Sequence, residues 1–479
     1  MKLRHVLLLP AALTLGLTCQ AFVAPSEATA SGSGTGIAQV SSDPENPSIG
    51  DVWINTTDHT MNWADAGGVT KISGMFTAWA STSDNLITSQ NIRYLGAFRV
   101  PDGTIGCSNW NTCVFSYGGG PIGFNKDGNG GSGSLFIGGH IVAGLTAEIT
   151  IPPIVNSSDI DDLNTASVLQ SFVDITEGNR KNVNLGGATN GGSVYNGGFL
   201  VWGDKLIGSV YTYYDGNGSQ YLSHYTSGLN LSTNGDFSGM FKLSNVAARL
   251  VGGYMCEIPA SQQAAFGGPA LTGQSGLSVI STSSSGPAVS VFDPSQLGVT
   301  DPVPATQLVY YPVNHPLAQT NTQNTLFNLT SAVTGIVFPE GYASVMFFGR
   351  HGSGEYCYGN GTSDQSLAGL PSGDGATYCY DPTDASKGPH AYPYKYQVWA
   401  YSTSDLLSVK NGTKQPWEIA PYSVWNFDLP FSNSAGSGHI LGVAYDNVSR
   451  KIYVSQKSGD LVGQYGRNPV VHVLQIDEP

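Results

Sequence analysis

The chain has 479 residues, of which 20 are Lys or Arg and 34 are Asp or Glu, so its formal net charge is −14 at pH 7. Binding to phosphate backbones needs a basic stripe, so this composition argues against nucleic acid as a partner. The 62 Gly and 24 Tyr, with only 11% charged residues, are poor for helices and favour strands joined by tight turns. The composition therefore predicts an all-β protein.

Residues 1–30 predict a secretory signal peptide. Lys2 and Arg4 precede an apolar stretch that is too short to span a bilayer, and Ala28 and Ala30 offer a cleavage site. No other apolar run approaches the roughly 20 residues that a membrane helix needs. We therefore expect an exported protein without a membrane span, either secreted into the extracellular space or periplasmic.

Residues 31–42 are rich in Ser and Gly and predict a flexible linker. In residues 43–74, Pro/Gly turns separate short alternating strands, with the pattern G-D-x-W-x-N-T-T followed by an aromatic residue and a Gly-Gly turn. This stretch resembles small β modules of phage tail fibres and bacterial surface proteins. The resemblance implies an attachment or spacer element.

Residues 90–479 repeat a pattern of Gly, a short apolar strand, a polar turn and a second apolar strand, which is typical of a β-hairpin. The hairpins occupy residues 123–140, 198–215, 335–352 and 442–459. A further strand follows them at 146–153, 288–298, 396–409 and 470–478. This recurrence predicts a β-propeller, and about 390 residues at 50 to 60 per blade give six or seven blades. The C-terminal strand is expected to pair with residues 91–100 and close the ring. A β-sandwich or a parallel β-helix is the alternative.

The cysteines suit an oxidising compartment. Cys107 and Cys113 are close enough in sequence to form one disulfide, and Cys357 and Cys379 bracket a second loop. Buried free thiols are the alternative, and Cys256 is left without a predicted partner.

The densest group of ionisable and hydroxyl side chains lies in "FFGRHGSGEYCYGNG", residues 347–361. This segment holds Arg350, His351, Tyr356 and Tyr358. Equivalent ends of propeller strands converge on the central axis, so histidines from other blades are candidates for the same site: His140, His224 and His439. The structural alternative is that each is a polar strand end with its own hydrogen bonds.

Arginine, histidine and tyrosine together supply what β-elimination from a uronate needs. A cation neutralises the carboxylate, a base removes the α-proton and an acid protonates the leaving oxygen. The mixture resembles that of secreted propeller polysaccharide lyases, such as ulvan and oligogalacturonate lyases. The resemblance implies a uronate-containing extracellular polysaccharide as substrate, Arg350 as the carboxylate clamp, and His351, His140 or Tyr356 as acid/base groups. Substrate-binding side chains are then expected at Tyr358, Tyr213, His224 and His439.

Three other functions fit the same residues. A metal-dependent propeller enzyme would hold a divalent metal with His140, His224, His351 and His439, similar to the four-histidine iron site of carotenoid-cleaving oxygenases. A non-catalytic protein would bind glycans or build a surface filament. Hydrolysis needs two carboxylates at a fixed separation, with candidates at Asp215, Glu257, Glu355 and Asp446.

Overall fold

The computed structural model describes residues 38–40, 46, 48, 52–55, 60–65, 68–72, 85–275, 283–313, 315–317 and 326–479. The chain forms two compact units, residues 1–80 and 81–479, and each is described by itself. The predicted signal peptide lies outside the described residues. No helix within the described ranges is long and apolar enough to cross a membrane.

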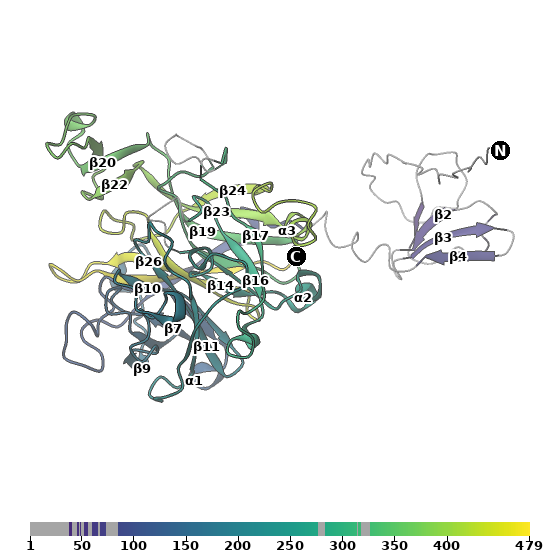
Figure 1. Cartoon of the computed structure of the whole chain (residues 1–479), viewed down its shortest axis with the longest axis horizontal. Helices are drawn as coiled ribbons and strands as arrows, with labels where there is room; N and C mark the ends of the chain where they lie inside the picture. The colour runs from purple at the N-terminus through teal and green to yellow at the C-terminus, as the bar shows by residue number, and fades with distance from the viewer. Residues whose placement is uncertain are drawn as a thin grey trace, which may run out of the picture. The chain divides into compact units, whose positions relative to one another are not determined.

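The first unit contains one four-stranded sheet in the order β1-β2-β3-β4 (Figure 1). Its strands are β1 (Ala38–Val40), β2 (Val52–Asn55), β3 (Thr60–Asp65) and β4 (Gly68–Ile72). Strand β1 runs parallel to β2, and the other pairs are antiparallel. Because β1 falls inside residues 31–42, part of the predicted linker is a strand of this sheet.

The second unit is built mainly from antiparallel sheets, and five of the sheets that the structure describes there have four strands. Sheet I contains β6 (Ile122–Asn125), β7 (Ser134–Gly138), β8 (Thr146–Thr150) and β9 (Val168–Val173). Sheet II contains β10 (Val194–Trp202), β11 (Lys205–Thr212), β12 (His224–Gly228) and β13 (Ser238–Phe241). Sheet III contains β14 (Met255–Glu257), β15 (Ala270–Gly273), β16 (Val289–Phe292) and β17 (Ala305–Val309).

Sheet IV contains β18 (Ala332–Val337), β19 (Ser344–Gly352), β23 (Tyr394–Ser402) and β24 (Ser423–Phe427). Between β19 and β23 the chain leaves this sheet as residues 353–393, which we call the lobe. The lobe carries its own three-stranded sheet of β20 (Cys357–Thr362), β21 (Tyr378–Tyr380) and β22 (Lys387–His390), which stands out from the body in Figure 1. The α-helices are α1 (Gly128–Gly131), α2 (Ala260–Phe266) and α3 (Thr403–Lys410).

Sheet V joins the two ends of the second unit. It contains β25 (Ile440–Asp446), β26 (Lys451–Asp460), β27 (Asn468–Ile476) and the early strand β5 (Ile92–Arg99). Strand β5 pairs antiparallel with β27, with Phe98 opposite Val471. The expected pairing of residues 91–100 with the C-terminal strand is therefore confirmed.

The first strands of the five sheets lie against one another in chain order: β6, β10, β14, β18 and β25, with β25 in turn against β6. Glycines allow this approach. A Cβ atom added at Gly198 would lie 2.0 Å from the carbonyl oxygen of Gly253, and one at Gly120 would lie 2.2 Å from that of Leu441. A cavity of only about 10 Å³ is lined by residues at or next to all five of these strands, so they pack closely there.

Both predicted disulfides are present, Cys107–Cys113 and Cys357–Cys379, and Cys256 is a buried free thiol. The first disulfide lies in the segment between β5 and β6, and the second ties β20 to β21 within the lobe. The first therefore cross-links a long connecting segment, whereas the second reinforces the small sheet of the lobe.

Candidate functional site

One edge of the five sheets gathers most of the predicted site residues. Successive strands of each sheet run in opposite directions. The segment that enters the first strand therefore lies at the same edge as the segment that joins the second strand to the third. We call this edge the loop edge. Many large apolar side chains are exposed in these segments: Trp110, Tyr117, Ile141, Val142, Leu185, Tyr213, Tyr214, Tyr221, Tyr358, Leu461 and Tyr465. Exposed rings concentrated at one edge are typical of a binding surface.

Arg350 and His351 lie side by side in sequence but on opposite faces of sheet IV. Their strand β19 pairs with β23 without a register shift, so successive side chains alternate between the two faces. Phe348, two residues before Arg350, packs in a core cluster with residues of sheet V. Phe347 instead packs with residues of sheet III. The structure therefore does not bring Arg350 and His351 together as clamp and base.

His351 has a local structural role. It is 5% exposed, and its Nδ1 makes a 2.9 Å hydrogen bond with Oγ of Ser331, at the entrance to β18. Burial lowers the pKa of His351 to about 4, so the ring is neutral near pH 7.

Arg350 faces the other way, toward the segment that enters β25. Its Nη1 donates a 2.8 Å hydrogen bond to the carbonyl oxygen of Ser437, and its guanidinium carbon lies 4.1 Å from the centroid of the Tyr394 ring. The residue is 8% exposed, and its Nε is buried without a hydrogen-bond partner. Burial lowers the pKa of Arg350, while Tyr394 and two nearby aspartates act in the opposite direction.

Two further basic residues accompany Arg350, and we call Arg350, His439 and Lys457 the cationic cluster. Burial, and then Arg350, lowers the pKa of Lys457, while Asp384 acts in the opposite direction. Within the described ranges, neither Arg350 nor Lys457 has a carboxylate within 4.0 Å; the ion pairs that the structure contains join other residues. Two partly desolvated cations without direct counter-ions make a site for an anionic group.

His439 supplies a neutral imidazole beside these cations. Burial, followed by Arg350 and Lys457, holds its pKa well below the usual value. Its Nδ1 lies 3.2 Å from the carbonyl oxygen of Gly436, an acceptor, so Nδ1 carries the proton and Nε2 the lone pair. His439 thus presents a neutral imidazole, with the lone pair of Nε2 free of the proton, beside two cations.

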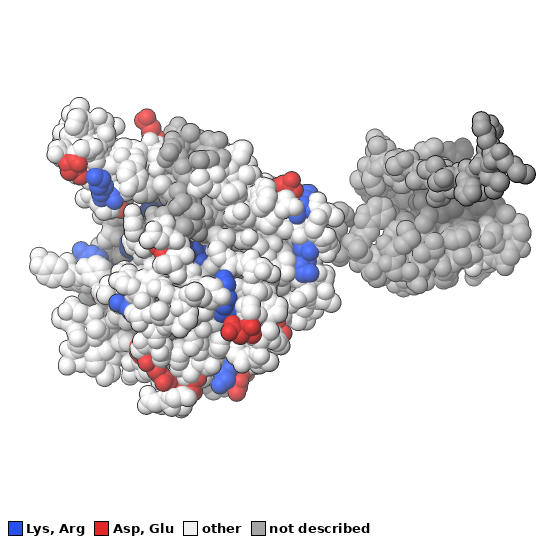
Figure 2. Space-filling model, in the orientation of Figure 1, with Lys and Arg blue, Asp and Glu red and all other residues white. Residues whose placement is uncertain are grey.

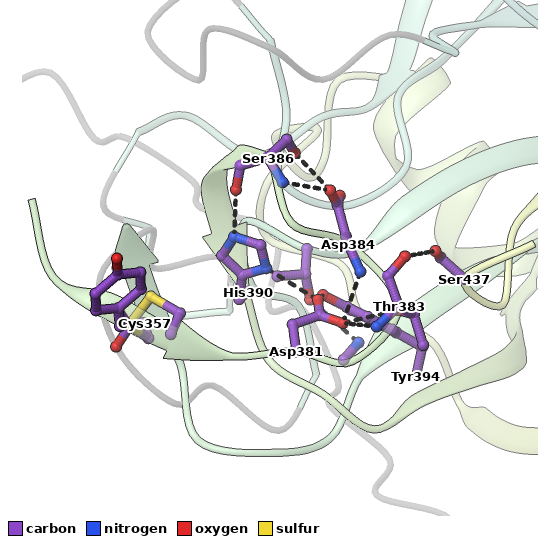
Figure 3. A network of polar contacts seen from close by, with 12 residues as sticks. Cys357, Asp381, Thr383, Asp384, Ser386, His390, Tyr394 and Ser437 are labelled. Carbon is purple, nitrogen blue, oxygen red and sulfur yellow. Dashed lines mark hydrogen bonds and ion pairs between the residues drawn. A yellow bond between two sulfur atoms is a disulfide. The ribbon is translucent and has the colours of Figure 1, made fainter. Parts of the chain in front are cut away.

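The lobe approaches the cluster through a buried network (Figure 3). The carboxylate of Asp381 accepts hydrogen bonds from the Tyr394 hydroxyl at 2.6 Å and from Nδ1 of His390 at 2.9 Å. Nε2 of His390 donates to the carbonyl oxygen of Ser386 at 3.0 Å. Tyr394 thus contacts both Asp381 and Arg350, and it couples the position of the lobe to the cationic cluster.

The pair Asp381–His390 makes the stability of the lobe itself dependent on pH. Burial alone would lower the pKa of His390, but its bonds to Asp381 and Ser386 raise it above its ordinary value. Burial alone would raise the pKa of Asp381, but the hydrogen bonds that it accepts hold it well below its usual range. The contribution of His390 to the stability of the lobe is complete below its pKa in the unfolded chain, about 6.5. This contribution is lost as the pH rises through the higher pKa of His390 in the folded protein. The aspartate contribution is present above about pH 4 and is lost below it.

We therefore expect the lobe to be most protected between about pH 4 and 6.5, and to open more often at about pH 9. Hydrogen exchange of backbone amides in residues 357–390, corrected for the intrinsic effect of pH, measures this. His390→Gln should remove the alkaline step while leaving exchange in β26 unchanged. An alkaline step that persists in His390→Gln would contradict this origin.

His140 and Tyr213 lie on other parts of the loop edge. The ring of His140 is 6.0 Å from that of Tyr117, which is exposed and whose backbone has φ +57, a strained value often found at functional positions. Tyr213 lies 6.0 Å from Tyr195, whose ring is 5.8 Å from that of Tyr211. We call Tyr195, Tyr211 and Tyr213 the tyrosine platform. Neither Tyr117 nor Tyr195 carries a sequence signal that singles it out.

Tyr356, Tyr358 and His224 complete the predicted set. Tyr358 is exposed on β20, whereas the Tyr356 hydroxyl is buried without a partner, and burial, with a smaller effect of Tyr358, raises its pKa to about 12. His224 is fully buried between sheets II and III, bonded to Ser223 and Thr272 at 2.9 and 3.0 Å. Burial lowers the pKa of His224 to about 3. The expectation that His224 binds substrate is therefore wrong, because both ring nitrogens are satisfied inside the core.

The metal and hydrolytic alternatives find little geometry to support them. The described part of the chain contains no group of three or more His, Cys, Asp or Glu side chains arranged to hold a metal ion. Glu257 and Asp446 end β14 and β25, far along their strands from the loop edge. Asp215 accepts hydrogen bonds from Ser219 and Gln220 within its own turn. Asn447, the neighbour of Asp446, donates a 3.3 Å hydrogen bond to Oε2 of Glu257, so these two candidates lie at the edge opposite the cationic cluster.

Comparisons with known proteins identify no family. No protein-family model matches the sequence, and no curated protein matches it. Among solved structures, a luciferin-regenerating enzyme is similar over 88% of this chain and 86% of its own, with 10% sequence identity and a TM-score of 0.32.

Proposed function

We propose that residues 85–479 form a five-bladed β-propeller that acts outside the cell on uronate-containing polysaccharide. The five sheets would be the blades, with the first strands around the axis and β5 closing the ring in sheet V. Five blades replace the six or seven expected from length because the lobe and the long segments of the loop edge take up the remaining residues. The two disulfides and the predicted signal peptide support an extracellular site of action.

The cationic cluster carries the proposal. Arg350 and Lys457 stand without a carboxylate partner within 4.0 Å in the described residues, in a chain whose net charge is −14. Charged side chains are sparse on the face shown in Figure 2. Arg350 and Lys457 are therefore not simply part of a generally basic surface. A uronate carboxylate would neutralise them and supply acceptors for the Lys457 ammonium and the outer guanidinium nitrogens.

The neutral imidazole of His439 then favours β-elimination. With its carboxylate neutralised, the sugar has a more acidic C5 proton, which Nε2 of His439 removes. The C4–O bond breaks, its electron pair leaves with the oxygen, and a C4=C5 double bond forms. The leaving oxygen takes a proton, for which Lys457 is the candidate donor because its pKa is lowered.

The primary test is an absorbance scan near 235 nm during incubation with a panel of uronate-containing polysaccharides, with and without a chelator. The unsaturated uronate that elimination creates absorbs there, whereas hydrolysis gives no such product. A neutral polysaccharide serves as the control. New reducing ends without a rise in absorbance would overturn elimination in favour of hydrolysis.

Lys457→Met should weaken binding of uronate oligosaccharides about tenfold or more, because it removes a charge-assisted contact. Wild-type affinity should fall as salt is added, and this dependence should be smaller in the variant. Isothermal titration at several salt concentrations measures both effects. Lys395→Met is the matched control, since Lys395 is an exposed lysine next to Tyr394 and its removal changes the net charge equally. Equal losses in the two variants would assign the effect to net charge alone.

A non-catalytic glycan-binding protein is the second candidate, and the tyrosine platform favours it. Tyr213 is the exposed ring of the three and is supported edge-to-face by Tyr195, so it offers a flat, partly polar surface on which a sugar ring can stack. Binding of acidic glycans without any absorbance change, and with loss on Tyr213→Ala, would select this function.

A further inference from the structure

A groove of about 590 Å³ lies on the flank of sheet II, and we call it the flank groove. Its walls come from the segment that enters β10, from Tyr221 and Leu222 just before β12, from strand β13, and from the segment between β16 and β17. None of the cationic cluster or the tyrosine platform lines it. Its volume is within the range of small-molecule sites, about 300 to 1,000 Å³.

Tyr221 provides an aromatic wall held in place from one side. The residue is 41% exposed, and Nζ of Lys242 lies 5.2 Å from the centroid of its ring. The ammonium is itself fixed by a 2.6 Å hydrogen bond to the carbonyl oxygen of Val246. The ring is therefore positioned before any ligand arrives, which limits the entropy lost on binding.

Side-chain amides provide oriented hydrogen-bonding groups. Nδ2 of Asn182 donates to Oδ1 of Asn179 at 2.9 Å, and Oδ1 of Asn182 accepts from the Thr189 hydroxyl at 2.9 Å. Each amide keeps unused donor or acceptor capacity after these bonds. Glycines at positions 186, 187, 239 and 298 expose further backbone groups in the lining.

The charge of the lining selects against acidic ligands. Asp301 is the only charged side chain among the residues that form the groove, and it is exposed. The Lys242 ammonium is not part of the lining and is already bonded to Val246. A carboxylate-bearing sugar would therefore meet a like charge as the one charged side chain of the lining, whereas the Lys242 ammonium lies against the Tyr221 ring outside the lining.

We propose that the flank groove is a second carbohydrate site, which binds two or three uncharged sugar units by stacking on Tyr221 and by hydrogen bonds to the amides. An aromatic ring, oriented amides and a single carboxylate match the apolar faces and hydroxyl groups of neutral hexoses or pentoses. This site is independent of the cationic cluster, so either proposal can fail while the other stands.

Titration calorimetry with neutral tri- and tetrasaccharides from β-linked glucose, xylose and mannose polymers tests the site. We expect Tyr221→Ala to weaken binding of the best ligand about tenfold or more, and Tyr221→Phe to retain it, because stacking needs the ring and not the hydroxyl. Tyr465→Ala, which removes an exposed tyrosine of another loop, should leave the affinity unchanged. No binding of any neutral oligosaccharide, or binding equally affected by Tyr465→Ala, would overturn the proposal.

Asp301→Asn tests the charge selection. In a Lys457→Met background, where the cationic cluster is weakened, the Asp301→Asn change should raise affinity for uronate trisaccharides severalfold, with the gain lost on adding Tyr221→Ala. Affinity that does not change with Asp301→Asn would overturn the selectivity for uncharged sugars. Loss of uronate oligosaccharide binding in Lys457→Met alone reports on the cationic cluster. The failures of the two proposals are therefore distinguishable.

Discussion

Replacing His439 with Gln is expected to lower the rate of elimination about 100- to 10,000-fold, the usual contribution of a positioned general base. The amide of Gln can still donate to the carbonyl oxygen of Gly436, so the local backbone contact is kept. What is lost is the lone pair on Nε2, which is the proposed base beside Arg350 and Lys457. Initial rates at 235 nm on the best uronate polysaccharide measure the change.

The matched control is His351→Gln. His351 is also a buried, neutral histidine of sheet IV, but it faces the opposite side of β19 and bonds to Ser331, so elimination should continue at near wild-type rates. The pH profile adds a second readout. Because the pKa of His439 is held below its usual value, kcat/KM should already be on its plateau at pH 6.5 and fall only in more acidic solution. Full activity in His439→Gln would contradict the assignment of His439 as the base. Loss of activity in His351→Gln would instead favour His351, which the sequence analysis expected as an acid/base group.

Much of the fold is readable from local patterns. The hairpin expected at 198–215 is β10 and β11, and that at 442–459 is β25 and β26, because short apolar runs on either side of a polar turn leave the chain few other conformations. The closing strand was also predictable, since an unpaired C-terminal strand would expose an edge. The number of sheets was not, because an average blade length cannot foresee an insertion such as the lobe.

The site was only partly predictable, for two physical reasons. The segment 347–361 does contribute Arg350, but strand alternation sends the neighbouring His351 to another face, which a list of residue types ignores. Tyr394 reaches Arg350 from β23, the neighbouring strand of the same sheet. Residues 437, 439 and 457 come from sheet V and the segment that enters it, and only the packing of sheet IV against sheet V brings them near. The network of Asp381 and His390 depends in the same way on how the lobe folds back onto β23.

Gly198→Ala is expected to lower the free energy of unfolding by about 3 kcal/mol, the upper part of the range for overpacking a closed interior. The new methyl would lie 2.0 Å from the carbonyl oxygen of Gly253, a backbone atom of the segment that enters sheet III. That oxygen also accepts a 2.6 Å hydrogen bond from the Ser209 hydroxyl of β11, so displacing it breaks a second contact between sheets II and III. Urea unfolding followed by tryptophan fluorescence measures the loss.

Gly216→Ala controls for the general effect of adding a methyl group at a glycine. Nothing lies within 4 Å of its Cβ position and its backbone does not have positive φ, so stability should change by less than about 0.5 kcal/mol. The difference between the two variants depends on how closely the first strands of sheets II and III approach. Because the cavity beside Gly198 has a volume of only about 10 Å³, we expect the clash to be relieved mainly by moving the neighbouring sheet. Equal stability of the two variants would mean that the strands are not in contact at the axis, and would remove the basis for a closed five-bladed ring.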